Sequence, residues 1–262
     1  MKAVILCGGQ GTRIRDISEI LPKPMLPIGD RPILWHIMKT YAHYGIKDFI
    51  LCLGYKGWLV KEFFLNYTAK IDDINLTLGE NNICNVGKGF DEAGWKITLA
   101  ETGEASQTGA RIWNVRRYLE GSQIFSVTYG DGVADIDLKA LLAAHKKSGL
   151  SATITGVHPS GRFGEMELNK DGVVTQFNEK PNVSSGVING GFMIFEKKAL
   201  NKYFRNGEDL VLETEVLTRM VKDRQLGMYK HNGFWQCVDT SREYHMLNEL
   251  WKQNKAPWKV WK

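Results

Sequence analysis

The sequence predicts an α/β fold: a Rossmann-like, doubly wound mixed sheet, mostly parallel, with a smaller antiparallel β layer in the C-terminal half. Through residue 148, short apolar runs alternate with segments of helical periodicity, as in consecutive βαβ units. The first apolar run leads directly into a glycine-rich turn, which is how such folds approach a phosphate. Strand patterns dominate after residue 150, and Asn169-Lys170-Asp171-Gly172 between two of them indicates a hairpin.

The first strand is expected at residues 2–6, which are apolar after the first position, as in a buried parallel strand. A helix is expected at 31–44, because Pro32 suits a helix start and Gly45 suits its end. The stretch between this strand and this helix is predicted to form a loop with one short helix near residues 15–20. Residues 81–94 have no periodicity and are expected to form a flexible loop. The other elements of this half are strands at 48–53, 95–101 and 123–129, and helices at 57–67, 109–119 and 137–147.

The second half is predicted to add more strands than helices. The aromatic C-terminal stretch 257–262 differs from a typical disordered tail, so we expect it to pack on something. Strands are expected at 152–157, 164–168, 173–177, 190–195, 228–231 and 235–238, and helices at 197–204, 211–222 and 241–252. No repeat or clear linker interrupts the pattern, so we expect a single domain over residues 1–262.

Composition excludes several classes of protein. A hydrophobic fraction of 43% fits a globular core, and the net charge of +5 is spread along the chain, which gives no indication of nucleic-acid binding. The four cysteines form no CxxC pair, which argues against structural zinc. No apolar stretch approaches the roughly 20 residues of a membrane helix, and the first apolar run is too short for a signal peptide. We therefore expect a cytoplasmic protein without nucleic-acid or membrane partners.

The turn after the first strand, Cys7-Gly8-Gly9-Gln10-Gly11-Thr12-Arg13, is followed by Pro22-Lys23-Pro24-Met25. It lacks the third glycine of the dinucleotide fingerprint and the Gly-Lys-Ser/Thr of a Walker A loop. Its glycines let backbone N–H groups approach phosphate oxygens, and two cations could bind phosphate beside them. A tight turn that merely needs glycine is the alternative. The attached Thr-Arg and Pro-Lys-Pro favour a nucleoside-triphosphate site.

Two carboxylates follow short apolar strands. Asp131 lies between glycines after the strand at 123–129, and Asp239 follows the strand at 235–238. The carboxyl ends of strands are where open α/β sheets bind ligands, and Mg²⁺ takes few carboxylates beside phosphate oxygens and water. Each aspartate has an alternative interpretation, as an Asp-Gly turn or as a turn or cap before the last helix. If the two converge, one metal ion gains two carboxylate ligands.

Two further stretches suit a phosphorylated sugar. Lys180 precedes a proline, which holds it extended near a strand end, where it could bind a second phosphate. Asn189 and the glycines after it offer hydrogen bonds to a hydroxyl-rich ligand. A solvated turn and a β-bulge are the corresponding alternatives. The six histidines fall in no metal-ligand spacing and are interpreted as structural or surface residues.

Taken together, these motifs resemble the sugar nucleotidyltransferase family. The glycine loop combined with Pro22-Lys23-Pro24 is specific to that family. Within it, the chain is similar to the members that use CTP and α-D-glucose 1-phosphate. That similarity runs over nearly the whole chain, through the stretches 32–38, 45–50, 54–57, 129–135, 161–164, 188–192, 233–236 and 255–259.

The resemblance implies Mg²⁺-dependent transfer of CMP from CTP to glucose 1-phosphate, giving CDP-glucose and pyrophosphate. It implies a nucleotide-binding half at 1–135 and a sugar-phosphate-binding half at 136–262. The implied catalytic residues are Arg13, Lys23 and Asp131, and the implied metal ligands are Asp131 and Asp239. The implied nucleotide-binding residues are Leu6, Cys7, Gly8, Gly9, Gln10, Gly11, Thr12, Arg13, Lys23, Ser106, Thr108, Arg111 and Gly130. The implied sugar-phosphate-binding residues are Glu179, Lys180, Asn189 and Gly190.

Two alternatives stay open. The loop and the aspartates do not read the base, so UTP or dTTP could replace CTP, and a catalytically silent regulatory homologue is the second possibility. Residues 80–95 match nothing in the family, and Val216 stands where the family tends to have proline after its second glutamate. We also expect a homo-oligomer, and the resemblance implies a role in deoxysugar, O-antigen and lipopolysaccharide synthesis.

Overall fold

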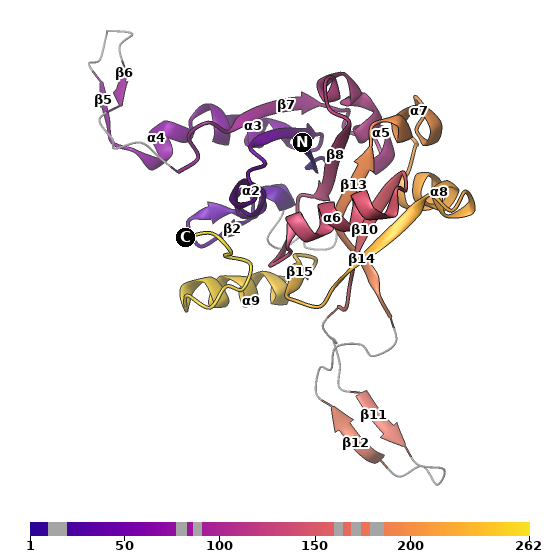
Figure 1. The fold of residues 1–262 in the computed structure, drawn as a ribbon. Helices are drawn as coiled ribbons and strands as arrows, with labels where there is room; N and C mark the ends of the chain where they lie inside the picture. Colours follow the sequence, from indigo (N-terminus) through magenta and orange to yellow (C-terminus); the bar gives the residue numbers. More distant parts are fainter. Residues whose placement is uncertain (10–19, 77–82, 86–90, 160–164, 169–173, 179–185) are drawn as a thin grey trace.

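The computed structural model describes residues 1–9, 20–76, 83–85, 91–159, 165–168, 174–178 and 186–262. Its centre is a seven-stranded sheet in the order β14-β10-β13-β8-β1-β4-β7 (Figure 1). Only β13 in this sheet runs antiparallel to its two neighbours; the other four adjacent pairs are parallel. The predicted mixed, mostly parallel sheet is confirmed.

The main-sheet strands are β1 (Lys2–Leu6), β4 (Asp48–Leu53), β7 (Lys96–Glu101), β8 (Ile124–Tyr129), β10 (Ala152–Val157), β13 (Ile188–Glu196) and β14 (Leu226–His231). The order of the strands puts β1 in the middle, between β8 and β4. Val4 and Leu6 pack into one apolar cluster, whereas Ala3 and Ile5 pack into the cluster on the opposite face. Both faces of β1 are therefore buried, which is why its sequence is an apolar run without alternation.

Helices cover the sheet, and short elements fill the connections. The α-helices are α2 (Ile33–His43), α3 (Gly57–Leu65), α4 (Tyr67–Ile71), α5 (Thr108–Asn114), α6 (Leu138–Ser148), α7 (Lys198–Tyr203), α8 (Thr218–Lys222) and α9 (Ser241–Lys252). The 3₁₀-helices are η2 (Lys23–Met25) and η3 (Arg116–Leu119), and η4 (Leu212–Leu217) is a π-helix. None of the helices in the described ranges combines the length and apolar character needed to span a bilayer.

Small antiparallel pairs lie outside the main sheet. They are β2 (Pro27–Ile28) with β3 (Arg31–Pro32), β5 (Ile74–Leu76) with β6 (Ile83–Asn85), β9 (Gly132–Ala134) with β15 (Trp235–Cys237), and β11 (Glu165–Leu168) with β12 (Val174–Asn178). The pairing of β11 with β12 confirms the predicted hairpin, and its turn at 169–172 lies outside the described residues. Figure 1 shows that hairpin apart from the main sheet. These pairs, of which β11 with β12 lies wholly in the C-terminal half, match the smaller antiparallel component that the sequence predicts.

Some predicted boundaries are wrong. Residues 83–85, expected in a loop, pair with β5. The helix expected at 109–119 ends at Asn114 and continues as a 3₁₀-helix, and the helix expected at 211–222 begins as a π-helix. The short strand β9 follows the Asp131 turn without having been predicted. The short helix expected near 15–20 falls largely outside the described residues.

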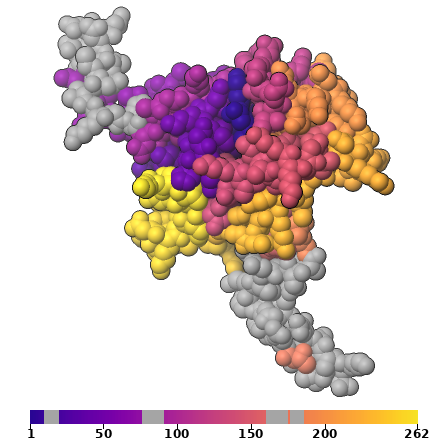
Figure 2. Space-filling model, in the orientation of Figure 1, coloured from indigo at the N-terminus to yellow at the C-terminus, as the bar shows by residue number. Residues whose placement is uncertain are grey.

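The aromatic C-terminal segment packs on its own chain, near α2. Trp258 is fully buried and stacks on Phe234 and Trp251, with ring centroids 5.6 and 6.4 Å apart. Its indole N–H donates to Nδ1 of His36 at 3.4 Å, and Nε2 of the same imidazole donates to the Ile28 carbonyl at 2.9 Å. Burial lowers the pKa of His36 to about 4. In Figure 2 these C-terminal residues, in yellow, lie against the violet N-terminal third.

Candidate active site

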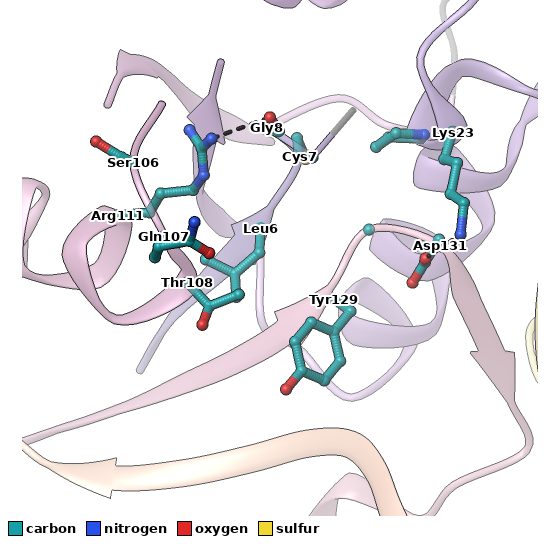
Figure 3. A pocket seen from close by; sticks show the side chains of 13 residues that line it. Leu6, Cys7, Gly8, Lys23, Ser106, Gln107, Thr108, Arg111, Tyr129 and Asp131 are labelled. Atoms are coloured by element: carbon teal, nitrogen blue, oxygen red, sulfur yellow. Dashed lines mark hydrogen bonds and ion pairs between the residues drawn. The ribbon is translucent and has the colours of Figure 1, made fainter. Parts of the chain in front are cut away.

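A pocket of about 230 Å³ opens where β1 and β8 end and α5 begins (Figure 3). This is the carboxyl edge of the parallel strands, where open α/β sheets bind their ligands. Ten of the residues singled out in the sequence line it: Leu6, Cys7, Gly8, Gly9, Lys23, Ser106, Thr108, Arg111, Gly130 and Asp131. The ends of the two strands are held together because the Gly130 N–H donates to the Leu6 carbonyl at 3.0 Å.

Arg111 holds the turn after β1 in place through a hydrogen bond to the Gly8 carbonyl. The residue is 4% exposed, and its guanidinium donates to the carbonyls of Gly8, Leu53, Gly103 and Glu104 at 2.8–3.2 Å. It also donates to the Thr102 hydroxyl at 2.8 Å. Burial lowers the pKa of this guanidinium, which still stays protonated. In this structure Arg111 therefore ties together three loops that frame the pocket, and Figure 3 shows it pointing at Gly8.

The glycine at position 8 has a packing reason. A Cβ built there would lie 2.2 Å from Arg111 Nη1, and a Cβ at Gly54 would lie 2.5 Å from the same atom. At Gly9 a Cβ would meet no described atom within 4 Å. Gly8 thus makes room for an internal cation, whereas Gly9 faces open space in the described part of the chain. Gly9 is therefore the residue whose backbone a ligand can approach.

Lys23 lies between the two predicted carboxylates. Its ammonium group donates to Asp131 Oδ2 at 3.3 Å and to Asp239 Oδ1. The pairing of β9 with β15 explains why residues so far apart in sequence meet: Gly132 faces Cys237, and the Val238 N–H donates to the Asp131 carbonyl at 2.8 Å. The convergence of the two aspartates, which the sequence left open, is therefore present.

Asp239 is not needed as a cap for α9. Thr240 caps that helix, and the Glu243 carboxylate accepts from the Thr240 N–H at 2.9 Å, which completes a capping box. Glu243 also accepts from the Asp239 N–H at 2.8 Å. The N-cap is thus Thr240, and the Asp239 carboxylate contacts Lys23.

Burial and the neighbouring charges shift both sides of this ion cluster. Burial raises the pKa of Asp131, the charge of Lys23 opposes that shift, and the Asp239 carboxylate adds to it. Burial alone would lower the pKa of Lys23, but the Asp131 charge and the hydrogen bond to Asp239 outweigh it, so the pKa is raised. Burial also raises the pKa of Cys7 and Cys52, so both thiols stay protonated and neither suits a nucleophile.

This donor set suits a divalent cation. Two carboxylates already bind one cation, the Lys23 ammonium, and they do so at the edge of a pocket lined by a glycine turn. Among the described residues no group of three His, Cys, Asp or Glu side chains could hold a metal. A protein that supplies two carboxylates and leaves the other positions to phosphates and water fits Mg²⁺.

A second polar network links the two halves of the chain across the pocket. Glu213, on the π-helix, accepts from the Thr108 hydroxyl at 2.7 Å and from the Tyr129 hydroxyl. Asn189 Nδ2 donates to the same Tyr129 oxygen at 3.5 Å. Predicted nucleotide-side and sugar-side residues thus meet through Tyr129 and Glu213. Burial is the main cause that raises the pKa of Tyr129, so its hydroxyl stays a donor.

Other predicted residues are placed less directly. The Ser106 hydroxyl donates to the Thr102 carbonyl at 2.6 Å, which leaves its oxygen free only to accept. The Gly190 carbonyl accepts from Trp235 Nε1 at 2.7 Å. Gln10, Gly11, Thr12, Arg13, Glu179 and Lys180 lie outside the described residues.

Sequence reasoning did not select Gln107, Pro24 and Tyr129, which also line the pocket, or Glu213 behind it. Tyr129 precedes Gly130-Asp131 on the same strand end, so its position was a usable signal. Glu213 is an acidic residue inside an otherwise apolar stretch of η4, which is a weaker signal.

Comparisons with known proteins agree with this geometry. A family model described as Nucleotidyl transferase matches residues 2–254. Over 261 residues and 100% of both chains, the sequence is 43% identical to a glucose-1-phosphate cytidylyltransferase of Salmonella typhimurium and 41% identical to a probable glucose-1-phosphate cytidylyltransferase of Bacillus subtilis. The fold is shared with a putative glucose-1-phosphate thymidylyltransferase from Bacillus anthracis, at a TM-score of 0.68 and 17% identity over 100% of this chain and 98% of that one. The chain therefore belongs to the nucleotidyl transferase family.

Proposed function

We propose that this protein transfers CMP from CTP to α-D-glucose 1-phosphate, forming CDP-glucose and pyrophosphate. The observation that carries the proposal is the cluster of Lys23, Asp131 and Asp239 at the edge of the glycine-turn pocket. The full-length similarity to relatives named glucose-1-phosphate cytidylyltransferase supports the choice of both substrates.

In the proposed reaction a phosphate oxygen of glucose 1-phosphate attacks the α-phosphorus of CTP. The bond from that phosphorus to the bridging oxygen breaks, and pyrophosphate leaves with the electron pair. The protein contributes positioning and charge neutralisation rather than covalent chemistry. Lys23 would act on the α-phosphate, and Arg13 on the nucleotide phosphates. Arg111 would hold the backbone of residues 8–9 in place for the nucleotide.

Asp131 and Asp239 would hold Mg²⁺ in this proposal. When bound, the metal would neutralise phosphate charge and orient the leaving group. Lys23 contacts both carboxylates, and its positive charge offsets the repulsion between these two adjacent anions. Asn189 and Gly190, with Glu179 and Lys180, would bind the sugar phosphate.

A direct assay tests the proposal. Pyrophosphate release is measured with glucose 1-phosphate and Mg²⁺ against CTP, UTP, dTTP and ATP, with glucose 6-phosphate replacing glucose 1-phosphate as the control. We expect pyrophosphate release only when CTP and glucose 1-phosphate are the substrates, with Mg²⁺ present. A preference for UTP or dTTP would overturn the cytidylyl assignment only. No release with any nucleotide would favour the silent regulatory homologue.

Four further expectations stay predictions: a single domain over 1–262 with halves at 1–135 and 136–262, a homo-oligomer, a cytoplasmic location, and a product used for deoxysugar and surface-polysaccharide synthesis.

A further inference from the structure

A second pocket, of about 640 Å³, lies where β8 begins and β13 ends. Gln123 precedes β8 and Lys197 follows β13, and the Lys197 N–H donates to the Gln123 carbonyl at 2.8 Å. The catalytic candidate Asp131 follows the opposite end of β8, a strand roughly 20 Å long. The two pockets are therefore separate, and α5 and α7, which lie together in Figure 1, border the second one.

The lining of this second pocket is strongly basic. Arg116, Arg117, Lys197 and Lys198 line it, with Glu120 as its one acidic residue. Among the described residues, no carboxylate lies within ion-pairing distance of these four cations. We call it the basic pocket and define it by those four cations. Gathering like charges in a concave surface focuses a positive potential that attracts anions.

The two arginines are held in position without using up their donors. Arg116 lies over the Trp113 ring, 4.3 Å from its centroid, and donates to the Trp113 carbonyl at 2.9 Å. Arg117 lies over the Tyr118 ring at 4.7 Å and donates to that hydroxyl at 2.7 Å. Stacking on a ring leaves the edge of a guanidinium fork available, and that fork matches phosphate oxygens in a bidentate way.

We propose that the basic pocket binds a phosphate-bearing small molecule at a site distinct from the catalytic pocket. Its volume falls within the roughly 300–1,000 Å³ typical of small-molecule sites, which exceeds what a lone phosphate needs. Gln123 and Asn201 also line it and supply amide groups for a base or sugar, whereas the amide nitrogen of the lining residue Asn114 donates to the Thr102 carbonyl at 3.0 Å. The binding claim does not depend on the proposed catalytic function.

Titration calorimetry on the full-length protein, in metal-free buffer of low ionic strength, tests the proposal with three probes: ADP, glucose 6-phosphate and inorganic phosphate. The variant Arg117→Glu/Lys198→Glu removes two of the four cations. The matched control Lys146→Glu/Lys147→Glu makes the same charge change on exposed positions of α6, outside the basic pocket. The variant Lys23→Ala alters the lining of the catalytic pocket, the one that contains Lys23 and Asp131, and so tests whether a probe binds there instead.

We expect ADP or glucose 6-phosphate to bind at least tenfold more tightly than inorganic phosphate. The affinity should fall at least tenfold in Arg117→Glu/Lys198→Glu and stay within twofold in the control and in Lys23→Ala. Equal loss in the control would assign the binding to net charge, and loss in Lys23→Ala would assign it to the catalytic pocket; either overturns the proposal. So would the absence of binding by all three probes, or equal affinity for inorganic phosphate.

Discussion

The catalytic pocket and the basic pocket lie at opposite ends of strand β8 and hold their cations in opposite ways. In the catalytic pocket, Arg111 is buried and donates five hydrogen bonds within the protein, and Lys23 is paired with two carboxylates. In the basic pocket, Arg116 and Arg117 are exposed. Within the described part of the chain, each lies over one aromatic ring and donates one hydrogen bond, Arg116 to a carbonyl and Arg117 to a hydroxyl.

The difference separates two uses of positive charge. A cation whose donors are all satisfied inside the protein fixes backbone geometry, because moving it would remove a hydrogen-bond donor from several buried carbonyls. A cation left in solvent contributes little to stability but remains available to a ligand. Lys23 is intermediate, since its two partners are themselves candidate metal ligands. Each prediction below tests one side of this comparison.

The largest effect is expected from Arg111→Met, which keeps the volume and removes the donors. Four carbonyls and one hydroxyl would lose a partner, and we expect a loss of about 3–5 kcal/mol in the free energy of unfolding. Urea denaturation measures it. The matched variant Arg116→Met, which loses one carbonyl contact and one ring contact at an exposed site, should cost less than about 1 kcal/mol. Equal losses in both variants would contradict the comparison.

Asp131→Asn tests the ion cluster itself. The substitution keeps the shape, leaves Lys23 paired with Asp239, and removes one carboxylate from the candidate metal site. We expect kcat for pyrophosphate release to fall by about 10²- to 10³-fold, with circular dichroism unchanged. Asp209→Asn, which breaks an exposed pair with Arg205 instead, should leave kcat within twofold. Near-normal turnover in Asp131→Asn would remove this residue from the site.

The neighbouring glycines 8 and 9 separate packing from ligand approach. Gly8→Ala places a methyl group 2.2 Å from Arg111 and is expected to destabilise the fold by about 1–3 kcal/mol. Gly9→Ala meets no described atom within 4 Å and should leave stability within about 0.5 kcal/mol while raising the KM for CTP. Thermal unfolding and steady-state kinetics together distinguish the two. A stability loss at Gly9 equal to that at Gly8 would refute the distinction.

Glu213→Gln tests whether the network behind the pocket positions both substrates. An amide has one oxygen in place of two, so one of the two hydroxyls, Thr108 or Tyr129, loses its acceptor and faces an N–H donor instead. We expect KM for at least one substrate to rise about tenfold, the equivalent of one 1.4 kcal/mol hydrogen bond, with kcat within threefold. Glu215→Gln on the same π-helix, whose partners are Arg205 and the Val211 N–H, is the control. Unchanged KM values in Glu213→Gln would leave Glu213 a purely structural residue.

Much of the fold could be predicted because it follows from local patterns. The apolar run of β1 and the helical spacing of α2 depend on residues that are neighbours in sequence. The aspartates at 131 and 239 could be suspected for the same reason, since each follows a short apolar strand. Their meeting could not be derived, because it depends on the pairing of β9 with β15, and β9 is only three residues long.

The role of Arg111 could not be derived from the sequence either. Its partners are chiefly backbone carbonyls from three separate segments, and a carbonyl leaves no residue-type signal. Glu213 lies in the other half of the chain from Thr108, on a π-helix that helical periodicity does not distinguish from an α-helix. Sequence patterns therefore identified the residues that line the pocket better than those that hold the lining in place.

The smallest effect is expected in the basic pocket. Lys198→Gln removes one of four like charges that have no carboxylate partner among the described residues, so no favourable pair is lost and some repulsion is relieved. We expect the free energy of unfolding to change by less than about 0.5 kcal/mol, with stabilisation the favoured sign, and the change should shrink as salt is raised. Urea denaturation at low and high ionic strength measures it. A loss of about 1 kcal/mol or more in the free energy of unfolding would mean that Lys198, like Arg111, stabilises the fold. The cations of the basic pocket would then not be available to a ligand, and the contrast between the two pockets would be wrong.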